Sequence, residues 1–244
     1  MHPYLDAESL IPSVIDLLRA SKTYCSENQI ILDERVFLAG YSEGGYVSLV
    51  TQKVIEEDYT SEFDLTAVAP MAGPYDLKGT VDTAFKSNNY QGDMAYIGFF
   101  FTAYNEIYGW NRLNDIFNAP YAAMMPNLYD GSRTWGEILA QLPSSFSELM
   151  NPDFINNYLN GKETDVSLVI QENTILNWTP QTPIHFFHGD ADITVPYQNV
   201  LTAIEQFESN GALNIELTTI PGGNHETSGP VASIEAIQWF ESFQ

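Results

Sequence analysis

Residues 35–44 read Arg35-Val-Phe-Leu-Ala-Gly40-Tyr41-Ser42-Glu43-Gly44, and the fold class can be inferred from them. The first six residues, apolar after Arg35, favour a short buried β-strand. Valines then recur at helical spacing from Glu43 to Glu56, which predicts a helix. A second apolar run, Leu65 to Ala72, predicts another strand. Strand, helix and strand in this order indicate a parallel βαβ unit, so we expect an α/β fold with an open, mostly parallel sheet.

The last quarter of the chain repeats this pattern. Pro183 to His188 predicts a strand, Val195 to Glu208 a helix, and Asn214 to Ile220 alternates like a strand. A closing helix is expected from about Pro230 to Phe243. The side chains expected to be buried on it are Val231, Ile234, Ile237 and Phe240.

A helix is also expected before the first strand, over Asp6 to Ser21. Leu10, Val14 and Leu17 lie on one face of it together with Ser21. The residues that widen this face are Ile11, Ile15 and Leu18.

Residues 75–180 differ in character from both flanking parts. They are rich in Tyr, Phe, Met, Asn and Pro and show no strand–helix alternation, although 94–108 and 134–142 have helical patterns. We therefore expect 1–74 and 181–244 to form the α/β core and 75–180 to form a helical insertion over the carboxyl edge of the sheet.

The chain is strongly acidic, with 32 Asp and Glu against 9 Lys and Arg and a formal net charge of −23. Binding to nucleic acid requires clustered cations, so this balance argues against a nucleic-acid partner. The charge favours solubility, and adaptation to high salt is the alternative. No apolar run reaches the length of a membrane span, and the residues after Met1 do not show the basic-then-apolar pattern expected of a secretory leader. Cys25 is the single cysteine, which excludes an intrachain disulfide.

Gly40-Tyr-Ser42-Glu-Gly44 is a G-x-S-x-G pattern at the point where the predicted strand gives way to the predicted helix. Flanking glycines allow the sharp turn that exposes a serine hydroxyl as a nucleophile. The backbone N–H of Glu43, at the helix start, is then placed to stabilise an oxyanion. The alternative is a helix N-cap serine that happens to lie between glycines.

A serine hydroxyl needs a base to accept its proton, and the chain offers four histidines. His185 and His188 lie three apart in a predicted strand and so point to opposite faces, which excludes a shared metal. We interpret them as structural, one in the core or at the sheet edge and one at the strand end. His225 follows the last predicted strand in a glycine-rich loop, which predicts a place at the carboxyl edge of the sheet. We predict that His225 is the base.

The base in turn needs a carboxylate. His188-Gly-Asp190-Ala-Asp192-Ile-Thr-Val-Pro196 supplies two just past a strand end. Asp192 is the preferred acid, and Asp190 is interpreted as a turn residue.

These motifs resemble the α/β-hydrolase family, in which the acid commonly sits in an H-G-x-x-D-x-x-V-P setting and the order along the chain is Ser, Asp, His. Residues 75–180 resemble the lids of bacterial esterases and secretory lipases. The resemblance implies hydrolysis through an acyl-enzyme, with Ser42 attacking, His225 transferring the proton and Asp192 orienting His225. It implies neither a metal nor a cofactor.

One feature departs from the family pattern, because only about 35 residues precede the strand before Ser42. The family has several strands there, and a loop after one of them donates the second oxyanion hydrogen bond. We find no such loop, so we expect either a chain truncated at its N-terminus or an oxyanion hole completed by another element. The reduced sheet would expose an edge, through which the chain could form a homo-oligomer.

The substrate is predicted from the insertion, whose aromatic residues could line an apolar pocket. Tyr41, Phe100 and Tyr104 are the candidate substrate-binding residues, and a role in the insertion's own core is the alternative for the latter two. A short- to medium-chain ester is the expected substrate. The competing functions are an aminopeptidase-like hydrolase, with an amine held by Glu106, Asp115 or Asp130, and a catalytically weak binding module.

Overall fold

The computed structural model describes residues 1–90 and 92–243 and divides the chain into two compact units. The sheet unit consists of Ala7–Asp76 and Ile175–Gln244, and the helical unit of Met1–Asp6 and Leu77–Thr174. The predicted boundaries lie between residues 74 and 75 and between 180 and 181. The observed boundaries along the chain lie between residues 76 and 77 and between 174 and 175. The first six residues belong to the helical unit.

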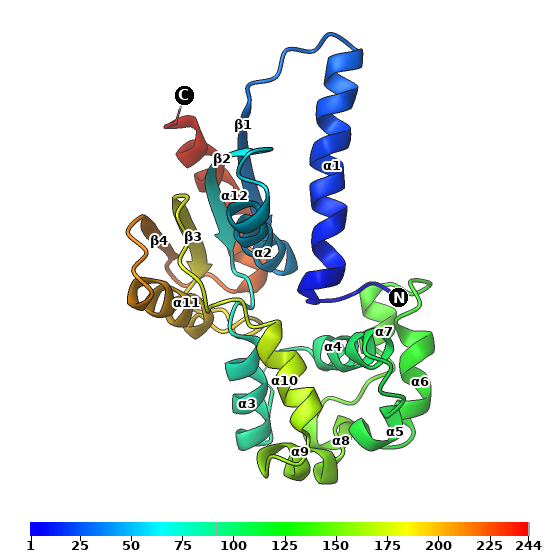
Figure 1. Ribbon diagram of the computed structural model, residues 1–244. Helices are drawn as coiled ribbons and strands as arrows, with labels where there is room; N and C mark the ends of the chain where they lie inside the picture. Colours follow the sequence, from blue (N-terminus) through cyan, green and yellow to red (C-terminus); the bar gives the residue numbers. More distant parts are fainter. Residues whose placement is uncertain (91, 244) are drawn as a thin grey trace. The chain divides into compact units, whose positions relative to one another are not determined.

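The described residues of the sheet unit form one parallel sheet (Figure 1). Its strands, in spatial as well as chain order, are β1 (Arg35–Tyr41), β2 (Asp64–Met71), β3 (Ile184–Gly189) and β4 (Ile215–Ile220). Each predicted strand is present within one or two residues of its predicted bounds. Because all strands run in the same direction, the segments that follow them emerge at one edge of the sheet.

Helices cover both faces of this sheet. On one face α1 (Ala7–Glu27) and α2 (Glu43–Asp58) pack over β1 and β2. The buried side chains of this layer are Ile15, Leu38, Ile55, Phe63 and Val68. On the other face α12 (His225–Glu241) packs on the sheet. Its layer contains the buried residues Ala69, Met71, Phe187, Ala232 and Ala236. The remaining helix, α11 (Gln198–Ser209), connects β3 to β4.

The contact face of α12 differs from the prediction. Val231, Ile234 and Ile237 are exposed by 41%, 58% and 59%, whereas Ala232 and Ala236 are buried. Small side chains let the helix axis approach the sheet closely, and the larger residues therefore lie on the outer side. The predicted burial of these three residues is wrong, and Phe240 is partly buried.

The contact face of α1 is also shifted. Ile11, Ile15 and Leu18, predicted to widen its apolar face, make its contacts with the sheet layer. Leu17, predicted to lie on that face, is 65% exposed. Within the described residues β1 pairs only with β2, so it is an edge strand beside this helix.

The helical unit contains a helix at 94–107, where one was predicted over 94–108, and a shorter form of the one predicted at 134–142. Its elements are α3 (Leu77–Ser87), α4 (Met94–Ile107), α5 (Leu113–Ile116), α6 (Tyr121–Leu128), α7 (Trp135–Leu139), α8 (Phe146–Leu149), α9 (Pro152–Leu159) and α10 (Thr164–Glu172). Aromatic rings form its core, where Phe101 stacks on Phe85 and meets Phe154 edge-on, with both pairs of centroids 5.8 Å apart.

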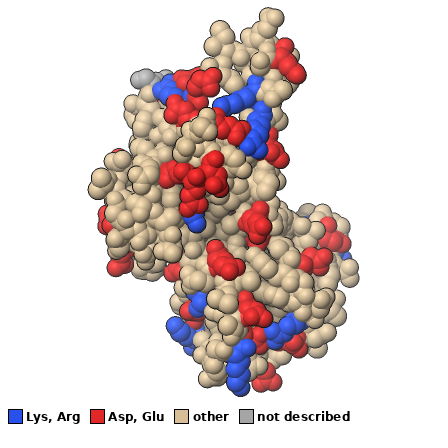
Figure 2. All heavy atoms as spheres, in the orientation of Figure 1, with Lys and Arg blue, Asp and Glu red and all other residues tan. Residues whose placement is uncertain are grey.

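Acidic side chains are spread over the visible face of the molecule, with basic ones among them (Figure 2). No helix within the described residues has both the length and the apolar character needed to span a membrane.

Candidate active site

Ser42 lies at the tight turn between β1 and α2. Its backbone has φ +58° and ψ −120°, a conformation that is rare for a residue with a side chain. The turn is held by a 2.8 Å hydrogen bond from Ser42 N–H to the carbonyl of Met71, at the end of β2. Glu43 begins α2, so its N–H lies at the positive end of the helix dipole.

Close backbone approaches explain two of the glycines around Ser42. A Cβ on Gly40 would lie 2.1 Å from the carbonyl oxygen of Gly44, and one on Gly45 would lie 2.5 Å from that of Met71. Gly44, predicted as the second glycine of the turn, has open space where a Cβ would stand. The close contact between α2 and β2 is therefore at Gly45, which the G-x-S-x-G pattern does not include.

Asp192 lies in the loop after β3 and is 4% exposed. Its Oδ1 accepts hydrogen bonds from the backbone N–H groups of Thr194 and Val195, both at 3.0 Å. The loop thus surrounds the Asp192 carboxylate, and Oδ2 faces the segment that follows β4. Asp190 accepts a 2.6 Å hydrogen bond from Gly222 N–H, which ties the loops after β3 and β4 together.

His225 is the first residue of α12 and does not lie in a flexible loop as expected. The helix begins five residues before its predicted start because Asn224 caps it. The Asn224 side chain accepts from the N–H groups of Glu226 and Thr227, and Thr227 Oγ1 in turn accepts from Asn224 N–H. The capped helix end gives the imidazole a defined position.

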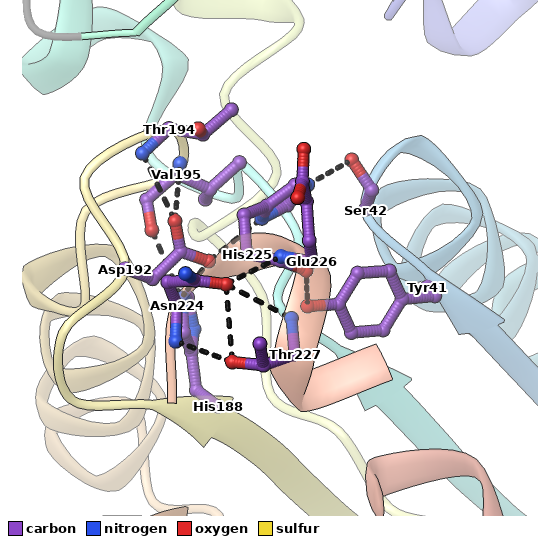
Figure 3. Close-up of polar contacts among 10 residues, drawn as sticks. All are labelled: Tyr41, Ser42, His188, Asp192, Thr194, Val195, Asn224, His225, Glu226 and Thr227. Atoms are coloured by element: carbon purple, nitrogen blue, oxygen red, sulfur yellow. Dashed lines mark hydrogen bonds and ion pairs between the residues drawn. The ribbon is translucent and has the colours of Figure 1, made fainter. Parts of the chain in front are cut away.

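These three residues form a continuous hydrogen-bonded chain (Figure 3). His225 Nδ1 lies 2.7 Å from Asp192 Oδ2, and His225 Nε2 lies 2.9 Å from Ser42 Oγ. A carboxylate can only accept, so Nδ1 carries the proton and Nε2 offers its lone pair to the Ser42 hydroxyl. All three belong to the sheet unit. The arrangement can deprotonate the serine hydroxyl as that oxygen attacks a substrate.

The environment of Asp192 favours its charged form. Burial opposes ionisation, but hydrogen bonds from His188, His225 and the backbone of Val195 outweigh it and lower the pKa of Asp192 to about 2. The acid is therefore ionised at neutral pH, where it can stabilise a positive charge on His225.

Tyr41 precedes the nucleophile, and its hydroxyl donates a hydrogen bond to the carbonyl of His225. Its ring lies 5.2 Å from the imidazole. Burial, together with the negative charge of Asp192, raises the pKa of Tyr41, so the hydroxyl stays protonated and keeps donating. The contact joins the end of β1 to the start of α12. The predicted role of Tyr41 in substrate binding stays a prediction.

The other two candidate substrate-binding residues lie in the helical unit. Phe100 is 4% exposed and Tyr104 is fully buried, their rings are 4.2 Å apart, and the Tyr104 hydroxyl donates to the carbonyl of Leu5. These contacts give them a place in that unit's core, and a role toward substrate stays a prediction.

The remaining strand histidines have different neighbours. His185 Nε2 lies 2.8 Å from Thr218 Oγ1, and its ring stacks on Phe187 with centroids 4.3 Å apart. His188 is fully buried, and its Nε2 lies 2.9 Å from the carbonyl of Val195 and 3.4 Å from Asp192 Oδ2. Within the described residues no group of three or more His, Cys, Asp or Glu side chains is arranged to hold a metal ion.

Sequence reasoning missed Gly45, Asn224 and the proximity of His188 to Asp192. The Gly44-Gly45 pair and the Asn224-His-Glu-Thr227 capping pattern were visible signals for the first two. His188 offered none, because its contact with Asp192 depends on how the intervening loop folds back.

The structure is similar to solved structures that include an esterase and a lipase. The rice cell-wall-degrading esterase LipA from Xanthomonas oryzae superposes with a TM-score of 0.84 at 27% identity, over 96% of this chain and 63% of that one. A protein from Legionella pneumophila gives a TM-score of 0.88 at 25% identity, over all of this chain and 65% of the other.

Candida antarctica lipase A shares the fold at 20% identity, with a TM-score of 0.75 over 98% of this chain and 54% of the lipase. This chain thus spans less than two thirds of the length of these proteins. No family model and no curated protein matches its sequence. The parallel sheet, its helices and these structural neighbours show that the chain has the α/β-hydrolase fold of esterases and lipases.

Proposed function

We propose that this protein is a serine hydrolase that cleaves carboxylic esters through an acyl-enzyme. The observation that carries the proposal is the hydrogen-bonded chain from Ser42 through His225 to the buried, ionised Asp192. Each of these residues lies at or just past the carboxyl end of a strand, where α/β sheets bind their ligands.

In the first half of the reaction Ser42 Oγ attacks the ester carbonyl carbon while His225 Nε2 takes the hydroxyl proton. The imidazolium then gives this proton to the alcohol oxygen as the ester C–O bond breaks, which leaves Ser42 acylated. In the second half water attacks the acyl carbon, His225 accepts a proton from it and returns it to Ser42 Oγ, and the carboxylic acid leaves. Asp192 stays ionised throughout and holds the imidazole.

The negative oxygen of the tetrahedral intermediate would be stabilised by the N–H of Glu43 at the start of α2. Loss of a single oxyanion donor typically costs about 2.7–4 kcal/mol in the transition state. The Glu43 N–H is therefore expected to make a contribution of this size.

The proposed substrates are neutral esters with short to medium acyl chains. The strong negative charge disfavours anionic substrates, and the structural neighbours named as esterases and a lipase support an ester. We further propose that the helical unit acts as a lid that determines which acyl chains reach Ser42.

The test is hydrolysis of a p-nitrophenyl ester series from acetyl to decanoyl, comparing the wild type with Ser42→Ala. We expect turnover that is highest for the shorter chains and is lost in the variant. A fluorophosphonate should label Ser42, and peptide mapping identifies the site. Labelling at another serine, with ester hydrolysis retained in Ser42→Ala, would rule out the assignment.

Two other outcomes separate the alternatives. Faster cleavage of an aminoacyl p-nitroanilide than of every ester would favour the aminopeptidase-like function. Neither turnover nor labelling would favour a binding module.

We also propose that two copies of the chain associate through the free edge of β1. No other strand of the described residues pairs with the backbone on that side of β1. Exposed apolar side chains lie on α1 and in the segment between α1 and β1. These are Leu17, Tyr24, Ile30, Ile31 and Leu32. Sedimentation equilibrium should give a dimer, and Ala39→Pro, which disrupts the edge, should give a monomer. A monomeric wild type contradicts this part of the proposal.

A further inference from the structure

His188 is a buried titratable side chain that the proposed reaction does not use. It lies near the end of β3, four residues before Asp192, and is fully excluded from solvent. A polar ring in such a place requires hydrogen-bond partners, because an unsatisfied buried polar group is costly.

Its Nε2 has two acceptors within reach. The carbonyl oxygen of Val195 lies at 2.9 Å and Asp192 Oδ2 at 3.4 Å (Figure 3). Both oxygens can only accept, so Nε2 carries a proton. The other nitrogen, Nδ1, is buried and has no hydrogen-bond partner within the described part of the chain. A proton there would be an unsatisfied buried donor, which favours the neutral ring with its hydrogen on Nε2.

These contacts close a ring around the acid. Val195 donates its N–H to Asp192 Oδ1 and accepts at its carbonyl from His188. His188 therefore holds the loop through Val195, whose N–H also binds the Asp192 carboxylate. In addition, His188 faces Asp192 Oδ2, the oxygen that bonds to His225. The rings of His188 and Tyr197 pack edge-to-face, with centroids 5.6 Å apart.

We infer that His188 is a positioning residue for the triad: it fixes the Asp192 loop so that Oδ2 is aimed at His225 Nδ1. The inference rests on the proposed function of Ser42, His225 and Asp192. The role is geometric, because His188 contacts the acid and its loop but not Ser42.

The experiment compares two amides of different reach in the intact chain. The amide nitrogen of glutamine can occupy the place of His188 Nε2, whereas that of asparagine matches Nδ1 and falls short of Val195. We expect His188→Gln to retain kcat within about threefold and His188→Asn to lose about 10–100-fold, the range for a hydrogen bond to a charged group, with KM changed by less than about twofold in both.

The matched control is His185, three residues earlier on the same strand and bonded to Thr218. His185→Gln and His185→Asn should leave kcat unchanged even where they lower the melting temperature. Equal losses of kcat in the two His188 variants, or an unchanged kcat in His188→Asn, would overturn the inference.

A second readout is independent of turnover. The proton that His225 Nδ1 donates to Asp192 should resonate far downfield in the proton NMR spectrum of the wild type. It should persist in His188→Gln and shift or broaden in His188→Asn. An unperturbed signal in His188→Asn would overturn the inference even if the wild type hydrolyses no ester, so a failure of the proposed function remains distinguishable.

Discussion

At the scale of single residues, Asp192 shows how a carboxylate can be buried and still ionised. Burial alone would raise its pKa, but two backbone N–H groups and two imidazole nitrogens face its oxygens and stabilise the charge. The sequence could place Asp192 after a strand, yet these donors come from the loop geometry and from α12.

This environment predicts an acid-sensitive contribution to stability. The pKa of Asp192 falls from 3.8 to about 2, so the ionised group stabilises the fold by about 2 kcal/mol above pH 4. Because the folded-state pKa is the lower one, this stabilisation is lost as the pH falls from about 4 toward 2. Asp192→Asn lacks it. Urea unfolding between pH 5 and pH 2 should show the free-energy gap between the wild type and the variant shrinking by about 2 kcal/mol, and a constant gap would contradict the argument.

Gly45 gives a steric prediction with an adjacent control. An alanine Cβ there would press on the Met71 carbonyl and force α2 away from β2. We expect Gly45→Ala to destabilise the protein by about 1–3 kcal/mol and to lower kcat by displacing Ser42. Gly44→Ala has room for its Cβ and should be neutral or stabilising by up to about 1 kcal/mol, because alanine favours the helix. Chemical denaturation and ester kinetics on both variants check this, and equal effects would refute it.

At the scale of elements, the start of α12 decides where the base stands. The helix was predicted from the apolar residues after Pro230, whereas it begins at His225 because Asn224 and Thr227 cap it. The position of His225 thus depends on a helix end, which is stiffer than a loop.

Removing this cap should affect both stability and catalysis. Asn224→Ala is expected to cost about 1 kcal/mol of stability, the usual value for an N-cap, and to lower kcat because His225 loses its anchor. Thr134→Ala is the matched control, because Thr134 caps α7 in the helical unit through a similar capping box with Glu137. It should cost a similar free energy without changing kcat. Thermal melts and ester kinetics on both variants decide, and an unchanged kcat in Asn224→Ala would count against the anchoring role.

Helix faces were harder to predict than helix positions. Periodicity located α1 and α12, but α12 buries a different side than expected, and on α1 only the residues predicted to widen the apolar face make the contacts. On α12 the alanines face the sheet and the larger apolar residues face outward, because the helix packs so close to the sheet that only small side chains fit between them. The sequence of the helix does not reveal how closely it packs on the sheet.

At the scale of the whole molecule, the net charge of −23 means that the acidic side chains repel one another, which destabilises the folded state. Added salt screens this repulsion, so stability should rise with ionic strength. From 10 mM to 500 mM NaCl we expect the melting temperature to increase, by about 2–4 °C for each kcal/mol gained. Differential scanning calorimetry measures this, and sucrose at matched viscosity serves as the control. A flat or falling melting temperature would contradict this prediction and would indicate that nearby basic groups already balance the acidic charges.

The strand and helix order, and with it the α/β class, could be predicted from the sequence because apolar periodicity and glycine positions are local signals. Ser42, His225 and Asp192 could be selected for the same reason, since each follows a predicted strand. Other features require distant parts of the chain to meet, and only the structure shows them. They are the hydrogen bonds among Ser42, His225 and Asp192, the position of His188 beside Asp192, the tight approach at Gly45 and the buried faces of the helices. These are set by the spacing of packed layers and by loop closure, which depend on atoms far apart in the sequence and leave no pattern in any one segment.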